Sequence, residues 1–158
     1  MQTTLFKEES SKDATNPAFN KAFVTCRFTP KVITELKPNE IFVFGSNLAG
    51  RHGKGAALQA VKWGAKYGVG LGLEGQTFAL PTKNRKMETC QIHEINSAVV
   101  QLHICVMENK DKHFLITKIG CGLAGYSVAE IAPMFKNFIR FSNVSLPMKF
   151  VDVLKNGR

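Results

Sequence analysis

Two mostly apolar segments, each followed by a run of glycines, dominate the pattern of hydrophobic and polar positions along the chain. The first reads IFVF over residues 41–44, and the second reads FLITKI over residues 114–119. Short runs rich in β-branched and aromatic residues are typical of buried strands. We therefore predict two buried strands, which end at Gly45 and at Gly120.

A helix is predicted after each glycine-rich loop. Residues 56–60 read AALQA, a run of strong helix formers, so we expect a helix over about residues 55–67. Four of its residues are expected to face the core: Ala56, Leu58, Val61 and Trp63. In the second unit, Ser127 and Glu130 have the spacing of a capping box and predict a helix start, with a bend at Pro133. The apolar face of this helix is expected to carry Val128, Ile131, Met134 or Phe135, Phe138 and Ile139.

The rest of the pattern predicts elements that complete an α/β chain. Before the first unit we expect a strand over residues 22–28 and a short helix over residues 30–36, capped by Thr29. Between the two units we expect an irregular loop over residues 68–75, a strand over residues 76–80 and a long helix over residues 88–109. A last strand is expected over residues 146–153. The long helix has an apolar stripe at helical spacing: Ile92, Ile95, Val99, Leu102 and Val106.

The alternation of strands and helices indicates a single α/β domain. At 158 residues, the chain has the length of one domain. Residues 1–17 are polar and without periodicity, so we expect a flexible N-terminal arm, followed by one domain over residues 18–158. Ligands of α/β sheets bind at the carboxyl ends of the strands. We therefore expect the two glycine loops to meet at one edge of a shared sheet.

The first glycine loop has the composition of an anion site. Between Gly45 and Gly55 it carries four glycines together with Arg51, His52 and Lys54. Glycines let backbone N–H groups approach a phosphate, and a helix N-terminus adds partial positive charge. An ordinary strand-to-helix turn is the alternative. The density of glycines and basic residues favours the anion site over that turn.

Composition and charge narrow the class of protein further. The net charge of +9 favours an anionic partner, which is a nucleotide, a nucleic acid or an acidic surface. No apolar run reaches the roughly 20 residues of a membrane span, and the polar start lacks the apolar core of a signal peptide. We therefore expect no membrane contact and a cytoplasmic location, in a prokaryote or in a host cell if the protein is viral.

Neither the cysteines nor the histidines predict a metal site. The four cysteines (Cys26, Cys90, Cys105 and Cys121) are widely spaced and form no C-x-x-C pair, so we expect reduced thiols. His93 and His103 lie on the long predicted helix at a spacing that is neither i, i+3 nor i, i+4, so they do not form a chelating pair. We expect neither a metal nor another cofactor.

Together, the two glycine loops resemble those of macrodomains, the ADP-ribose-binding modules. The segments are GSNLAGRHGKGAA over residues 45–57 and ITKIGCGLAGY over residues 116–126. The resemblance is greatest to the terminal ADP-ribose glycohydrolase type and to macro-like proteins of phages and bacteria, and it covers roughly residues 41–153. It implies a three-layer α/β/α fold with a mixed central sheet flanked by helices.

The resemblance also implies roles for individual residues. Asn47 is similar to the asparagine that holds the distal ribose, and Lys83 to the lysine of the glycohydrolase subset that attacks the anomeric carbon. Tyr126 is expected against the distal ribose. The ligand-binding residues implied are Phe44, Gly45, Ser46, Asn47, Gly53, Lys54, Gly55 and Ala56 in the first unit, and Gly120, Cys121, Gly122, Leu123, Ala124, Gly125 and Tyr126 in the second.

The sequence departs from the family pattern at two places. Ala124 stands where the glycohydrolase subset has an aspartate, and neither loop contains a carboxylate for general acid–base catalysis. Thr29 and Pro30 stand roughly where macrodomains have the Gly-Asp pair that reads adenine. His52 is the candidate for a substitute base, and pairing with a phosphate is its alternative role.

Three hypotheses follow for the function. The chain binds ADP-ribose or a related NAD-derived nucleotide, free or attached to a protein or a nucleic acid. Alternatively, it cleaves an ADP-ribosyl linkage with Lys83 as the nucleophile. The third hypothesis is a nucleic-acid-binding protein, which the +9 charge suggests. That class calls for aromatic side chains interleaved with basic residues on an exposed face, whereas most of the twelve phenylalanines fall at predicted core positions.

Overall fold

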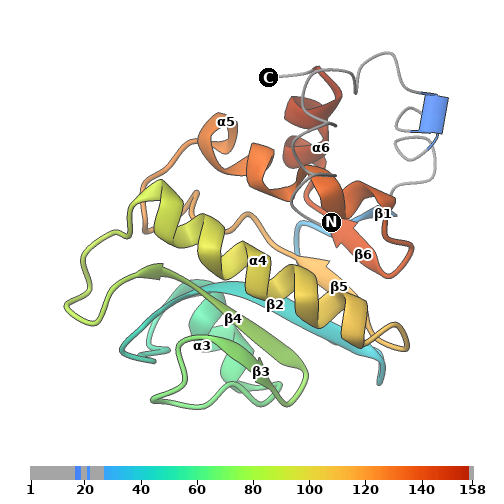
Figure 1. The fold of residues 1–158 in the computed structure, drawn as a ribbon. Coiled ribbons are helices and arrows are strands. Elements are labelled where there is room, and N and C mark those ends of the chain that lie inside the picture. The colour runs from blue at the N-terminus through green and yellow to red at the C-terminus, as the bar shows by residue number, and fades with distance from the viewer. Residues whose placement is uncertain (1–16, 19–20, 22–26, 157–158) are drawn as a thin grey trace.

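A six-stranded mixed sheet forms the centre of the molecule, which we describe from a computed structural model (Figure 1). The structure describes residues 17–18, 21 and 27–156. The strands lie in the order β1-β6-β5-β2-β4-β3, and all neighbouring pairs are parallel except β3 and β4. Their bounds are β1 Arg27–Phe28, β2 Glu40–Asn47, β3 Gly72–Glu74, β4 Thr77–Lys83, β5 His113–Ile116 and β6 Val144–Leu146.

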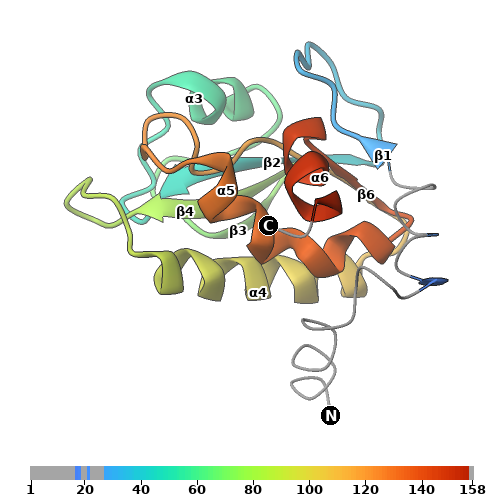
Figure 2. The same cartoon turned by 90° about the horizontal axis from the view of Figure 1, so that it is seen from above.

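Helices cover both faces of this sheet, which confirms the three-layer α/β/α prediction (Figure 2). Helix α3 (Gly55–Val61) lies on one face, and α4 (Ile92–Glu108) lies on the other. The C-terminal part adds α5 (Val128–Ile131), the 3₁₀ helix η2 (Ala132–Arg140) and α6 (Met148–Lys155). Among the described residues, no helix combines the length and the apolar character needed to cross a membrane.

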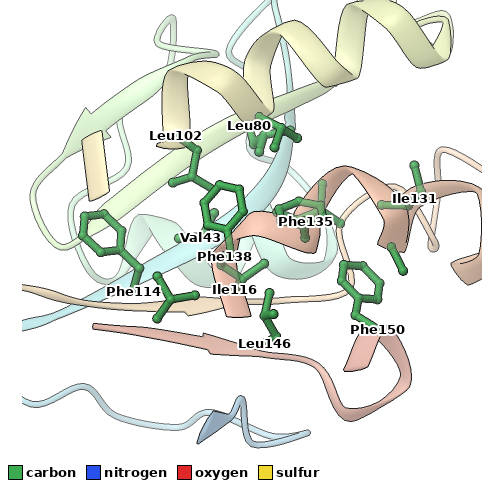
Figure 3. Close-up of a cluster of buried hydrophobic side chains, with 14 of the residues drawn as sticks. Val43, Leu80, Leu102, Phe114, Ile116, Ile131, Phe135, Phe138, Leu146 and Phe150 are labelled. Atoms are coloured by element: carbon green, nitrogen blue, oxygen red, sulfur yellow. The ribbon is translucent and has the colours of Figure 1, made fainter. Parts of the chain in front are cut away.

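The central strand β2 divides its side chains between two hydrophobic clusters. Ile41 and Val43 point into the larger cluster, in which α4, α5, η2 and α6 bury their apolar side chains (Figure 3). Phe42 and Phe44 point to the opposite face and pack with Ala57, Ala60 and neighbouring residues. Successive side chains of a strand alternate between faces, so an apolar run of this kind requires a cover on both sides.

Several predicted elements are confirmed. The apolar stripe of α4 is buried at four of its five predicted positions, Ile95, Val99, Leu102 and Val106, whereas Ile92 is exposed. Ser127 caps α5, since its hydroxyl accepts a hydrogen bond from the Glu130 amide while the Glu130 carboxylate accepts one from the Ser127 amide. Beyond Ile131 the helix tightens into η2, whose second residue, Pro133, cannot donate a backbone hydrogen bond.

Two predicted elements are wrong. Residues 30–36 form no helix. The Thr29 hydroxyl donates to the Ile116 carbonyl oxygen (2.7 Å) and therefore does not cap a helix. The β-branched residues that follow also disfavour a helix. Residues 146–153 are not one strand: β6 ends at Leu146, and α6 begins directly after Pro147. The apolar residues that suggested a strand are buried at helical spacing: Phe150, Val151 and Leu154.

Three other predictions need adjustment. The helix expected over residues 55–67 ends at Val61, and it buries Ala57 and Ala60 while Leu58 is 53% exposed. The loop expected over residues 68–75 contains the short strand β3, which extends the sheet by pairing with β4. Of the strand expected over residues 22–28, residues 27–28 form β1 and residues 22–26 lie outside the described residues, as does the predicted arm up to residue 16.

Candidate functional site

The two glycine loops lie side by side at the carboxyl edge of the sheet and enclose a cleft of about 570 Å³, here called the loop cleft. A Cβ atom placed on Gly45 would lie 3.8 Å from the Gly120 nitrogen, so the two backbones approach closely where β2 and β5 end. The cleft is lined by Gly45, Ser46, Asn47, Arg51, Gly53, Lys54, Gly55, Ala56, Ala57, Thr82, Lys83, Met87, Thr117, Lys118, Ile119, Gly120, Gly122, Leu123 and Ala124.

The first loop is held by the side chain of Asn47. Its Oδ1 accepts from the Arg51 amide at 2.9 Å, and its Nδ2 donates to the Arg51 carbonyl oxygen at 2.8 Å. The Leu48 amide donates to the Lys83 carbonyl oxygen at 2.9 Å, which ties the loop to the end of β4. Asn47 therefore fixes the backbone that presents residues 53–56 to the cleft.

A close backbone contact supports the same loop from behind. A Cβ atom on Gly70 would lie 2.2 Å from the Asn47 carbonyl oxygen and 2.8 Å from the Leu48 Cα. The Ser46 hydroxyl donates to the Gly70 carbonyl oxygen at 2.5 Å. Only glycine fits at position 70, because any side chain would push the end of β2 away.

The second loop is shaped by a left-handed residue and by two hydroxyl hydrogen bonds. Gly120 has a φ of +79°, a conformation that side chains disfavour. The Thr89 hydroxyl donates to the Ala124 carbonyl oxygen at 3.1 Å, and the Tyr126 hydroxyl donates to the Cys90 carbonyl oxygen at 2.5 Å. Both bonds fasten the loop to the segment between β4 and α4.

Both loops keep backbone N–H groups without a protein acceptor. In the second loop, the amides of Cys121, Gly125 and Tyr126 are hydrogen-bonded. The amides that have no acceptor within the described part of the chain are Gly120, Gly122, Leu123 and Ala124 in this loop, and Gly53, Gly55, Ala56 and Ala57 in the first. No side chain caps α3. Because these donors line one cleft and include the first turn of α3, the set has the character of an anion-binding surface.

The charges that line the loop cleft have one sign. Arg51, Lys54, Lys83 and Lys118 belong to its walls, and no aspartate or glutamate does. Lys83 ends β4 opposite Asn47, where an irregularity in the β2–β4 register follows Ser46. None of these four cations has a carboxylate partner among the residues that the structure describes.

A second cavity of about 600 Å³ adjoins the loop cleft, and we call it the side cavity. The two cavities share Ala56, Thr117 and Lys118. The side cavity is otherwise lined by Phe28, Thr29, Pro30, Lys31, Ile33, Phe42, Gln59, Pro147, Met148 and Lys149. The Gln59 amide nitrogen donates to the Ile33 carbonyl oxygen, which leaves the Gln59 side-chain carbonyl as an acceptor at this wall.

Five residues predicted for the site do not line the loop cleft: Phe44, His52, Cys121, Gly125 and Tyr126. Phe44 is buried beneath the first loop, because it alternates with Val43 along β2. Tyr126 points to Cys90, with which its hydroxyl bonds. Gly125 has a φ of +87° and shapes the turn behind the cleft.

His52, the predicted substitute base, is a fully buried structural residue. Its ring packs edge-on against Phe44 and lies 5.6 Å from the Tyr67 ring. Nε2 lies 2.9 Å from the Lys66 carbonyl oxygen and 3.2 Å from that of Val69. Since both partners are acceptors, Nε2 carries the proton, and the ring anchors the segment after α3 instead of facing the cleft.

Cys121 lies in the second loop but has the properties of an unreactive thiol. Burial raises its pKa, and Glu130 adds to this effect while Lys118 opposes it. The thiol donates to the Ile119 carbonyl oxygen at 3.6 Å. Because the thiolate is the nucleophile, a raised pKa argues against covalent catalysis by this residue. Among the described residues, no group of three metal-ligating side chains occurs.

The sequence reasoning missed several lining residues, among them Thr82, Met87, Thr117 and Lys118. Thr117 and Lys118 directly follow β5. A shorter boundary for that strand would have placed them at the ligand-binding edge. Nothing in the local sequence pattern indicates that Met87 belongs to the site. It reaches the cleft because the chain turns back after β4.

The close contact at Gly70 generates a stability prediction. We expect Gly70→Ala to lower the free energy of unfolding by about 1–3 kcal/mol, because the added methyl group overlaps the Asn47 carbonyl. Gly53→Ala is the matched control, since a Cβ there meets no atom within 4 Å. The control is expected to be neutral or stabilising by up to about 1 kcal/mol. Urea denaturation measures both, and equal stabilities would contradict the account of this contact.

Comparisons with known proteins establish a fold relationship alone. No family model matches the chain, and no curated protein matches it either. One solved structure that is similar to it is a protein of unknown function from Bacteroides thetaiotaomicron. The two share 14% sequence identity with a TM-score of 0.52, and the match covers 77% of this chain and 96% of the other. At this identity the likeness supports the α/β architecture of the chain.

Proposed function

We propose that the chain binds ADP-ribose or a related NAD-derived nucleotide, with the diphosphate in the loop cleft. The observation that carries this proposal is that eight residues whose amides have no protein acceptor, from both loops, line one cleft. A diphosphate offers several anionic oxygens on adjacent centres, so it satisfies donors from both loops at once. Simple hydration satisfies the amides too, but it does not account for four cations around them.

The side cavity suits the nucleoside of such a ligand. Its wall has apolar side chains from three segments, including Phe28, Phe42 and Met148, and such surfaces pack well against a base. The carbonyl of Gln59 is placed to accept a hydrogen bond from an amino group. In this proposal, the acceptor takes the part of the carboxylate that macrodomains have roughly where Thr29 and Pro30 stand in this chain.

The opposite end of the loop cleft is assigned to the distal ribose. Asn47 and Lys83 are paired across β2 and β4 at this end, beside Arg51. In this proposal the protein is a binder of the free nucleotide or of an ADP-ribosyl group attached to another molecule. Cleavage with Lys83 as nucleophile is the second candidate, which rests on the position of Lys83 in the cleft wall.

A nucleic-acid-binding function has less support from the surface. Binding of single strands uses exposed aromatic side chains as stacking platforms. Among the large hydrophobic residues that the structure describes as exposed, the aromatic ones are Phe28 and Tyr67. Phe28 lines the side cavity and Tyr67 lies over His52, so the two do not form a stacking row.

Calorimetric titration with ADP-ribose tests the binding proposal. We expect saturable binding by the wild type, and a roughly tenfold weaker affinity for Lys118→Ala, because a charge-assisted hydrogen bond to phosphate is lost. Lys110→Ala is the control, since Lys110 is exposed and lines neither cavity. Absence of saturable heat from ADP-ribose, with saturable heat from an oligonucleotide, would favour the nucleic-acid function instead.

A turnover assay separates binding from cleavage. The lining of the loop cleft includes no carboxylate and no histidine to carry protons, and such groups typically contribute 10²–10⁴-fold to rates. We therefore expect release of ADP-ribose from an ADP-ribosylated peptide to equal the protein-free blank. Release above the blank that Lys83→Ala abolishes would establish the hydrolase and contradict this expectation.

A further inference from the structure

The side cavity carries more positive charge than a neutral nucleoside needs. Three lysines line it, and they come from separate segments: Lys31 follows β1, Lys118 follows β5 and Lys149 lies in the first turn of α6. All three are exposed, and none has a carboxylate partner among the described residues. No aspartate or glutamate lines the cavity.

These lysines differ in what they can contact. Lys118 lines both cavities, so the diphosphate of the proposed ligand accounts for it. Lys31 and Lys149 line the side cavity alone. A nucleoside placed there would add no negative charge, so the positive charge of these two side chains would stay uncompensated. The amino end of α6, which begins at Met148, adds partial positive charge of the same sign.

We infer that the preferred ligand carries a further phosphate on its proximal nucleoside, in addition to the diphosphate. The ligand class is thus a phosphorylated ADP-ribose of the kind that NADP would give, with its extra phosphomonoester between Lys31 and Lys149. This inference rests on the proposed function, because it takes the diphosphate to occupy the loop cleft. A phosphomonoester at neutral pH carries close to two negative charges and neutralises both ammonium groups.

The polar side chains of the side cavity agree with the assignment of the base to Gln59 and of the extra phosphate to the lysines. The hydroxyls of Thr29 and Thr117 donate to the carbonyl oxygens of Ile116 and Val43, so they are committed to the sheet. Gln59 remains to read the base. The lysines are thus the side-chain donors in this cavity that are left for an anionic group.

The test compares ADP-ribose with 2′-phospho-ADP-ribose by calorimetry at low and at high salt. We expect the phosphorylated ligand to bind about tenfold more tightly at low salt, and the preference to shrink at high salt because exposed charges are screened. In Lys31→Gln/Lys149→Gln the preference should vanish, while the affinity for ADP-ribose changes less than about threefold. The control Lys110→Gln/Lys155→Gln removes the same charge from exposed residues outside both cavities and should keep the preference.

Each remaining result overturns the inference in a recognisable way. Equal affinities for the two ligands would refute the extra phosphate and leave the proposed function intact. A preference that survives in Lys31→Gln/Lys149→Gln would place the phosphate elsewhere. If neither ligand binds saturably to the wild type, the proposed function itself fails, and this inference fails with it.

Discussion

The unpaired backbone amides at the carboxyl edge of the sheet are the constraint on which the rest of the site depends. Gly53, Gly55, Gly122 and Leu123 are exposed, so water reaches this group of amides, and the fold gives them no protein acceptor. The charges nearby are all positive, so the protein does not supply the missing acceptor from its own carboxylates. An anion that enters the cleft therefore meets donors that are already in position. It has to displace only the water that is bound to them.

Much of the surrounding structure serves to hold these donors in place. Asn47 closes the first loop on Arg51, and the hydroxyls of Thr89 and Tyr126 fasten the second loop to the segment after β4. His52, buried behind the first loop, bonds two carbonyl groups of the segment after α3. Polar residues that resemble catalytic groups in the sequence thus act as supports of the backbone.

The sequence carried enough information for the fold class and for the meeting of the two glycine loops at one cleft, because both depend on periodicity and on glycine. The buried strands, the stripe of α4 and the capping box at Ser127 were predictable from local chemistry. Residues 146–153 were misread because an apolar stretch of eight residues fits a strand or a helix until its partner surface is known. Side-chain direction was not predictable at His52 and Tyr126, since tertiary hydrogen bonds turn both away from the cleft.

The side cavity was beyond sequence reasoning for a similar reason. Its walls come from the residues after β1, from α3, from the residues after β5 and from the start of α6, which only the tertiary structure brings together. The departure from the family pattern at Thr29 and Pro30 pointed to this region without showing what replaces the missing carboxylate. The structure places Gln59 and three lysines in the walls of this cavity.

The most direct test of the account is a titration of the ¹⁵N-labelled protein with ADP-ribose, followed by amide NMR signals. The account predicts saturable changes concentrated in the amides of residues 53–57 and 120–124, with little change at Gly64 and Gly75, which pack against each other and line neither cavity. Saturable binding that leaves those two loop segments unchanged, or no saturable change anywhere, would contradict it.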